Sequence, residues 1–181
     1  MKVIGISGTI IGEKMSGVVK RVLEEIQSVD PDVEVELLDL KNYQIQFCDG
    51  RDPSTYEGDT KKVIEIMNSG DAFVFGTPIF NASLSGPLKN LIDLTPVETL
   101  RNKVMGFIAT GGTYQHYLVI ENQLKPIAGY FRAYVAPSSV YLTREHFFEN
   151  QLIENEEIQQ RIGNLAKELV QLQKSLKVNV Y

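Results

Sequence analysis

The sequence is poor in the residues that form cross-links and metal sites. Its 181 residues include one cysteine, two histidines and no tryptophan. The single cysteine, Cys48, excludes a disulfide within the chain, so nothing indicates an oxidising compartment. The two histidines, His116 and His146, are too far apart in sequence to form a metal-binding motif by themselves. We therefore expect no metal site.

Long apolar runs and clusters of basic residues are also absent. No apolar stretch approaches the roughly 20 residues that a membrane helix needs, and the N-terminal residues lack the pattern of a secretory signal. The formal net charge is −5 and no basic run occurs, which argues against a nucleic-acid surface. The hydrophobic content of 43% is typical of globular proteins. We expect one soluble, cytoplasmic domain over residues 1–181, with no nucleic-acid or membrane partner.

Strand-like and helix-like patterns alternate along the chain. The expected strands cover residues 2–7, 33–38, 72–76, 103–110 and part of 132–142, where Pro137 interrupts the pattern. The expected helices cover residues 16–29, 60–69, 86–94, 114–125 (ending before Pro126) and a C-terminal segment with apolar residues from Ile158 to Leu176. Residues 40–59 lack periodicity, so we expect a surface loop there.

This alternation predicts an α/β fold with three layers, in which helices cover both faces of a parallel sheet. Five strands favour the doubly wound order 2-1-3-4-5. Such sheets bind ligands beyond the C-terminal ends of their strands, where the strand order reverses. The loops after the first, third and fourth strands should therefore carry the function.

The loop after the first strand suits a terminal phosphate. Between Ser7 and Ser16, two glycines let backbone amides face outward, and the hydroxyls of Thr9 and Ser16 can donate to phosphate oxygens. The helix that follows adds the positive end of its dipole. The glycine patterns of P-loops and of Rossmann dinucleotide sites are absent. The same residues also fit an ordinary strand–helix connection in which Ser16 caps the helix.

The loops after the third and fourth strands suit a flat, half-apolar ring. Pro78, Ile79 and Phe80 can form a shelf for the ring, and Asn81 offers amide groups to its polar edge. The segment Thr110–Thr113 contains Gly111-Gly112, and consecutive backbone N–H groups there can hold a carbonyl-rich edge and stabilise negative charge on it. A phosphate cradle, a ring shelf and a carbonyl clamp together describe FMN. The alternatives are an inward-packing Phe80 and a plain tight turn at the glycines.

These residues resemble the NAD(P)H-dependent FMN reductase family over nearly the whole chain. The most specific matches are Thr77–Phe80 with Ser85–Asp93, and Ala109–Thr113 with His116 and Leu124–Pro126. Within the family, the chain is most similar to reductases that supply reduced flavin to alkanesulfonate monooxygenases. The resemblance implies a flavodoxin-like three-layer sandwich and hydride transfer from the nicotinamide of NAD(P)H to N5 of FMN. The cofactor carries that chemistry, so we expect no catalytic side chain.

The resemblance also implies site residues and partners. The FMN-binding residues would be Thr9, Ser16 and Gly17 at the phosphate, Pro78, Ile79, Phe80 and Asn81 beside the isoalloxazine, and Thr110, Gly111, Gly112 and Thr113 at the pyrimidine edge. A homodimer or homotetramer with the flavin near a subunit interface would be the assembled form. A flavin-dependent monooxygenase would be the protein partner.

Two positions differ from the family pattern. Ile11 stands where members often have an arginine in the phosphate loop, which leaves Lys14 as a substitute cation. Asn122 stands where flavin-transferring members can carry a tyrosine. Two alternatives therefore stay open. One is a reductase that retains FMN and reduces quinones, azo compounds or metal oxyanions, and the other is a flavodoxin-like electron carrier without turnover.

Overall fold

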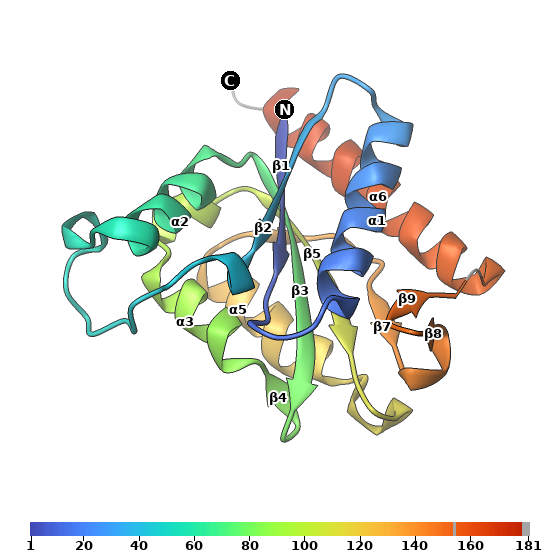
Figure 1. Ribbon diagram of the computed structural model, residues 1–181. Coiled ribbons are helices and arrows are strands. Elements are labelled where there is room, and N and C mark those ends of the chain that lie inside the picture. The colour runs from blue at the N-terminus through green and yellow to red at the C-terminus, as the bar shows by residue number, and fades with distance from the viewer. Residues whose placement is uncertain (154, 179–181) are drawn as a thin grey trace.

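Helices cover both faces of a largely parallel sheet in the computed structural model, which describes residues 1–153 and 155–178 (Figure 1). The strand order is β2-β1-β3-β5, with β6 and β7 both paired to β5. These strands are β1 (Lys2–Ser7), β2 (Glu34–Asp39), β3 (Ala72–Phe80), β5 (Val104–Thr110), β6 (Tyr134–Val135) and β7 (Val140–Leu142). Because β6 and β7 are one strand position interrupted near Pro137, the predicted fold class and order are confirmed.

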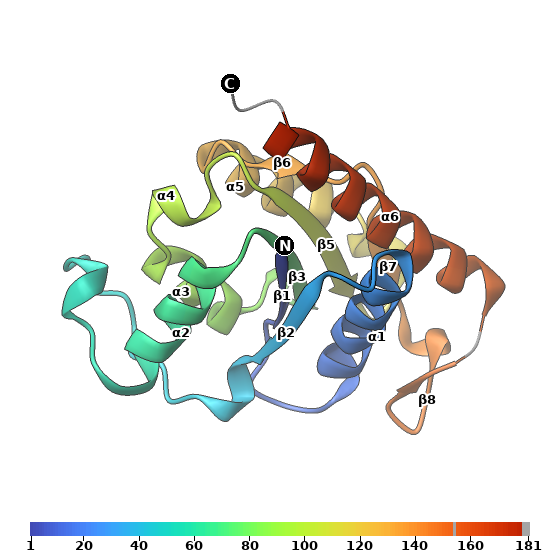
Figure 2. The same ribbon diagram turned by 90° about the horizontal axis from the view of Figure 1, so that it is seen from above.

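The helices form two layers, one on each side of the sheet (Figure 2). One layer contains α1 (Lys14–Val29) and α6 (Glu156–Val178). The other contains α2 (Gly58–Ser69), α3 (Gly86–Leu94), the short α4 (Val97–Leu100) and α5 (Lys125–Tyr130). None of the described helices is long and apolar enough to cross a membrane.

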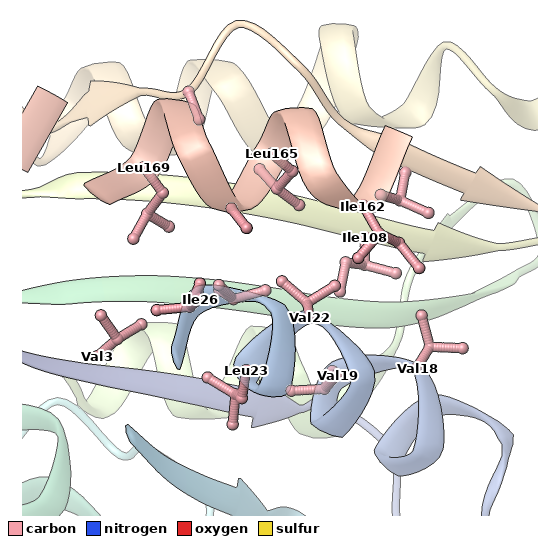
Figure 3. Close-up of a cluster of buried hydrophobic side chains, with 14 of the residues drawn as sticks. Val3, Val18, Val19, Val22, Leu23, Ile26, Ile108, Ile162, Leu165 and Leu169 are labelled. Atoms are coloured by element: carbon pink, nitrogen blue, oxygen red, sulfur yellow. The ribbon is translucent and has the colours of Figure 1, made fainter. Parts of the chain in front are cut away.

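The central strands are apolar on both faces because a helical layer covers each face. In β1, Val3 packs in the cluster beneath α1 and α6, whereas Ile4 and Ile6 pack in the cluster beneath α2 and α3. Figure 3 shows the first cluster, in which α1 and α6 meet over the sheet. Its labelled members are Val3, Val18, Val19, Val22, Leu23, Ile26, Ile108, Ile162, Leu165 and Leu169.

Helix α6 also completes the hydrogen bonding of a strand. The Gln173 side chain is buried, and its Oε1 accepts a hydrogen bond from the backbone N of Val104 at 2.8 Å. Val104 is the first residue of β5. The amide oxygen therefore satisfies a buried donor that would otherwise cost free energy.

The first helix begins earlier than expected, and this corrects the role predicted for Ser16 as a cap. Helix α1 starts at Lys14, so Ser16 lies inside its first turn. The Ser16 hydroxyl donates to the carbonyl oxygen of Glu13 at 3.0 Å and accepts no capping bond. Glu13 is the residue before the helix, and its side chain makes no capping bond either. The amide groups at the start of α1 therefore lack a side-chain cap.

The third strand is longer than expected and ends in a hairpin. Strand β3 continues past Gly76 to Phe80, turns back through Asn81 and Ala82, and pairs with β4 (Ser83–Leu84) in the antiparallel sense. The backbone φ angles of Asn81 and Ala82 are 48° and 61°. Two positive φ angles in a two-residue loop are typical of the tight turns whose twist matches a β-hairpin.

The segment 114–125 is not one helix that ends before Pro126. It contains a 3-10 turn (Tyr114–His116) and a π-helix (Ile120–Leu124), and α5 then runs through Pro126. The expected stop is wrong because Pro126 occupies the first turn of α5, where proline is tolerated.

Two other segments carry structure that periodicity did not reveal. Residues 40–59 contain two 3-10 turns and bury Tyr56, whose hydroxyl donates to Oδ1 of Asp49 at 2.9 Å. A small hairpin of β8 (Phe147–Phe148) and β9 (Gln151–Leu152) precedes α6. Strands this short show no measurable alternation in sequence.

The packing of α6 predicts the cost of truncating one of its leucines. Leu165 is fully buried against the sheet, so Leu165→Ala should lower the free energy of unfolding by about 2–5 kcal/mol. The matched control is Leu172→Ala, because Leu172 lies on the same helix and is only half-buried. This substitution should lower the free energy of unfolding clearly less. Urea denaturation followed by circular dichroism measures both. Equal losses for the two variants would contradict the packing described here.

Candidate functional site

The loops after β1, β3 and β5 emerge at one edge of the sheet. These strands are direct neighbours and run parallel, so their C-terminal ends point the same way (Figure 1, lower edge). Pro78 at the end of β3 lies opposite Thr110 at the end of β5. The sequence expectation that the three loops share one edge therefore agrees with the geometry.

The first two loops are tied together by a buried serine. The Ser85 hydroxyl donates to the carbonyl oxygen of Gly8 and accepts from the backbone N of Leu88 at 3.2 Å, which caps α3. The Ser85 backbone N donates to Oγ1 of Thr77 at 3.0 Å. Gly8 itself donates to the oxygen of Gly76 at 2.8 Å, and a Cβ on Gly8 would lie 2.6 Å from that oxygen. Only glycine fits so close to the neighbouring strand.

Of the residues predicted to bind phosphate, Thr9 lies in the first loop, whereas Ser16 and Gly17 lie at the start of α1. Thr9 is only 4% exposed, and its hydroxyl bonds with the backbone of Ile11, accepting from N at 3.3 Å and donating to O at 3.2 Å. Ser16 donates to Glu13 as described above. Gly17 is exposed and, with Ser16, borders a cavity of about 590 Å³ between α1 and the β8–β9 hairpin. In the structure both hydroxyls therefore bond within their own segment.

A group that sequence reasoning did not assign lies at the end of β1. The Ser7 hydroxyl is fully buried and has no hydrogen-bond partner among the described residues. Buried polar atoms are almost always paired, so an unpaired one calls for an explanation. Ser7 alternates with Gly5, on which a Cβ would meet Val19 and Leu23 of α1, and therefore faces that helix. An unused hydroxyl beside an uncapped helix start fits an anionic ligand.

The predicted ring shelf lies on the β3–β4 hairpin. Pro78 and Ile79 are half-buried, whereas Phe80 is 48% exposed and Asn81 is exposed. This exposure contradicts the alternative that Phe80 packs into the core. The hairpin is fastened by Gln123 of the π-helix, which accepts from the Ser83 hydroxyl at 2.7 Å and donates to the Ala82 oxygen at 3.0 Å.

The predicted clamp is a turn attached to β7. Gly111 donates from its backbone N to the oxygen of Leu142 at 2.9 Å, and the Tyr141 hydroxyl donates to the oxygen of Thr113 at 2.6 Å. Gly112 is exposed, and a Cβ there would meet nothing within 4 Å. In residues 1–153 and 155–178, no acceptor is found for the backbone N–H groups of Gly112 and Thr113. These donors remain available to a ligand.

Three titratable side chains, Tyr114, Glu145 and His146, lie next to the clamp. The Glu145 carboxylate hydrogen-bonds with the Tyr114 hydroxyl and thereby raises the pKa of Tyr114. Hydrogen bonds from Thr143 and then from Tyr114 lower the pKa of Glu145. His146 accepts at Nδ1 from the backbone N of Thr143 at 2.9 Å, which makes it part of this turn. In the part of the chain that the structure describes, no three His, Cys, Asp or Glu side chains are grouped to hold a metal ion.

Known proteins resemble this chain in both sequence and fold. Residues 1–147 match the family model described as NADPH-dependent FMN reductase. An NAD(P)H-dependent FAD/FMN reductase of Geobacillus thermodenitrificans is 55% identical over 177 residues, which cover 98% of this chain and 96% of that protein. Among solved structures, an oxidoreductase from Corynebacterium diphtheriae is 25% identical with a TM-score of 0.77, covering 96% of this chain and 97% of that one.

A flavodoxin from an archaeon shares the fold, with a TM-score of 0.68 at 11% identity over 96% of this chain and 99% of that one. Such a low identity shows the fold alone. The family match covers most of the chain and includes β1, β3 and β5 with the three loops that follow them. The chain therefore belongs to the NADPH-dependent FMN reductase family.

Proposed function

We propose that this protein, an oxidoreductase that works with FMN and NAD(P)H, releases reduced flavin to a separate flavin-dependent monooxygenase. The observation that supports the proposal is the exposure of the residues that would hold the flavin ring. Phe80, Asn81 and Gly112 all lie exposed at the open edge of the sheet. A flavin held there can exchange with solvent, as a flavin that is a substrate must.

The chain's own groups fit the phosphate of FMN. The unpaired Ser7 hydroxyl and the uncapped start of α1 offer donors, and the hydroxyls of Thr9 and Ser16 can exchange their local bonds for a charged acceptor. Hydrogen bonds to a charged group are the stronger kind. Lys14, at the first position of α1, would supply the cation that the loop itself lacks at Ile11.

The hairpin and the clamp fit the ring. Ile79 and Phe80 offer an apolar face, and Asn81 offers an amide to the polar edge. The free N–H groups of Gly112 and Thr113 would face the pyrimidine edge and stabilise negative charge there. Bound FMN would supply the hydride chemistry at its N5 with NAD(P)H as the donor, and this chemistry belongs to the cofactor. The chain's contribution is binding, orientation and electrostatics.

A second candidate function is an FMN-retaining reductase of quinones, azo compounds or metal oxyanions. Asn122 favours it, because flavin-transferring members can carry a tyrosine at this position. Asn122 is exposed on the π-helix, which also fastens the β3–β4 hairpin through Gln123. A homodimer or homotetramer would bury apolar side chains at its subunit contact. Tyr117 and Leu118, which precede the π-helix, are exposed side chains that such a contact would cover.

Initial-rate kinetics separate the two functions. If FMN is a released substrate, the purified protein should be colourless and should oxidise NAD(P)H by a sequential mechanism that requires added FMN. A yellow protein with ping-pong kinetics and an added acceptor would support the FMN-retaining reductase instead. Failure to oxidise NAD(P)H with added FMN would contradict both.

Removing the Thr9 hydroxyl should weaken the hold on the phosphate. Loss of one hydrogen bond to a charged group costs about 1–3 kcal/mol, so Thr9→Ala should raise the Kd for FMN about 5- to 150-fold. Fluorescence titration with FMN measures the effect. Riboflavin, which lacks the phosphate, is the matched control ligand, and its affinity should not change. An equal loss for both flavins would show that Thr9 only shapes the loop.

A side chain at Gly112 should block the ring without harming the fold. A Cβ at Gly112 has open space and its φ is not positive, so Gly112→Val should keep the melting temperature and raise the Kd for FMN at least about tenfold. Gly129→Val is the control, because Gly129 has equal space but lies on α5. Unchanged FMN affinity in Gly112→Val would remove the clamp assignment.

A further inference from the structure

A buried tyrosine organises the turn that carries the free amide groups. Tyr141 belongs to β7 and lies opposite Ala109 of β5, with only 6% of its surface exposed. Its hydroxyl donates to the Thr113 oxygen at 2.6 Å. Burial raises the pKa of Tyr141, so the hydroxyl keeps its proton and remains a donor at neutral pH.

The hydroxyl also explains the first glycine of the turn. A Cβ built on Gly111 would lie 2.1 Å from the phenolic oxygen of Tyr141, which no side chain can tolerate. The backbone N of Gly111 is fixed on Leu142, the residue after Tyr141. Strand β7 therefore holds the turn at two points, namely the Gly111 amide and the Thr113 carbonyl.

This attachment determines which groups face outward. In a trans peptide the C=O and N–H point in opposite directions. Because Tyr141 draws the Thr113 carbonyl inward, the N–H of the same peptide unit, that of Tyr114, points away from β7. A ligand on the side of the turn away from β7 would therefore not meet this carbonyl oxygen. A carbonyl oxygen turned to that side would repel the carbonyl-rich edge of a flavin.

We propose that Tyr141 is a positioning residue for flavin reduction, which fixes the Gly111–Thr113 turn so that its amide groups stabilise the reduced flavin. The inference rests on the proposed function, because it requires FMN at the clamp. Tyr141 itself is buried behind the turn and acts through it. Its effect should be larger on reduced than on oxidised FMN, because reduction places negative charge near N1, where the amide donors would act.

The test is Tyr141→Phe, which keeps the ring and removes the hydroxyl. Without FMN, hydrogen–deuterium exchange in residues 111–116 should become faster, because the turn loses one of its two attachments to β7. The Kd for oxidised FMN should rise about tenfold. The Kd for reduced FMN should rise by a further factor of about ten. That further loss corresponds to a midpoint potential about 30 mV more negative for the two-electron couple.

Tyr56→Phe is the matched control. Tyr56 is also buried, and its hydroxyl also hydrogen-bonds to a loop residue, Asp49, but it lies in the 40–59 segment beside α2. Both variants should lose similar thermal stability, and only Tyr141→Phe should change the exchange of residues 111–116, the Kd and the midpoint potential.

The outcomes separate this inference from the function on which it rests. A wild-type protein that binds no FMN overturns the proposed function and this inference together. A wild type that binds FMN, with a Tyr141→Phe variant of unchanged Kd and potential, overturns the inference alone. Equal changes in Tyr56→Phe would also overturn it, because the effect would then be one of general stability.

Discussion

The parallel pairing of β1, β3 and β5 is the constraint on which the rest of the structure depends. Parallel neighbours must end on the same side, so the loops that follow them meet although they lie far apart in sequence. Each strand can hold that place only because it is apolar on both faces and is covered by a helical layer on each. The core thus determines where the polar chemistry can occur.

Three side chains hold the loops at the site edge in place. Ser85 ties the first loop to the start of α3, Gln123 ties the β3–β4 hairpin to the π-helix, and Tyr141 ties the last turn to β7. In each case a side chain of one segment binds the backbone of another. Such hydrogen bonds between segments reduce the conformational freedom that the loops would have to lose on binding. An edge built this way is therefore largely organised before its ligand arrives.

The strands and the three loops could be predicted because apolar runs and glycine positions are local signals. The strand order followed from the usual arrangement of five strands in a doubly wound sheet. The π-helix at Ile120–Leu124 could not be predicted, since it depends on packing against β4 and β5. The start of α5 just before Pro126 was missed although proline is tolerated in a first helical turn. The unpaired hydroxyl of Ser7 was equally hidden, because burial is a property of the folded chain. Tyr141 lay within an expected strand, and only the fold shows that its hydroxyl reaches Thr113.

Helix α6 shows that the boundary of a shared family region and the boundary of a folding unit need not coincide. The family match ends at residue 147, before α6 begins at Glu156. Yet α6 covers one face of β5, and the side-chain oxygen of Gln173 in α6 accepts a hydrogen bond from the first amide of β5. A chain cut at the end of the shared region would keep every loop at the site edge and lose the support behind one of them. The extent of the family model alone would therefore set the minimal length of this enzyme too short.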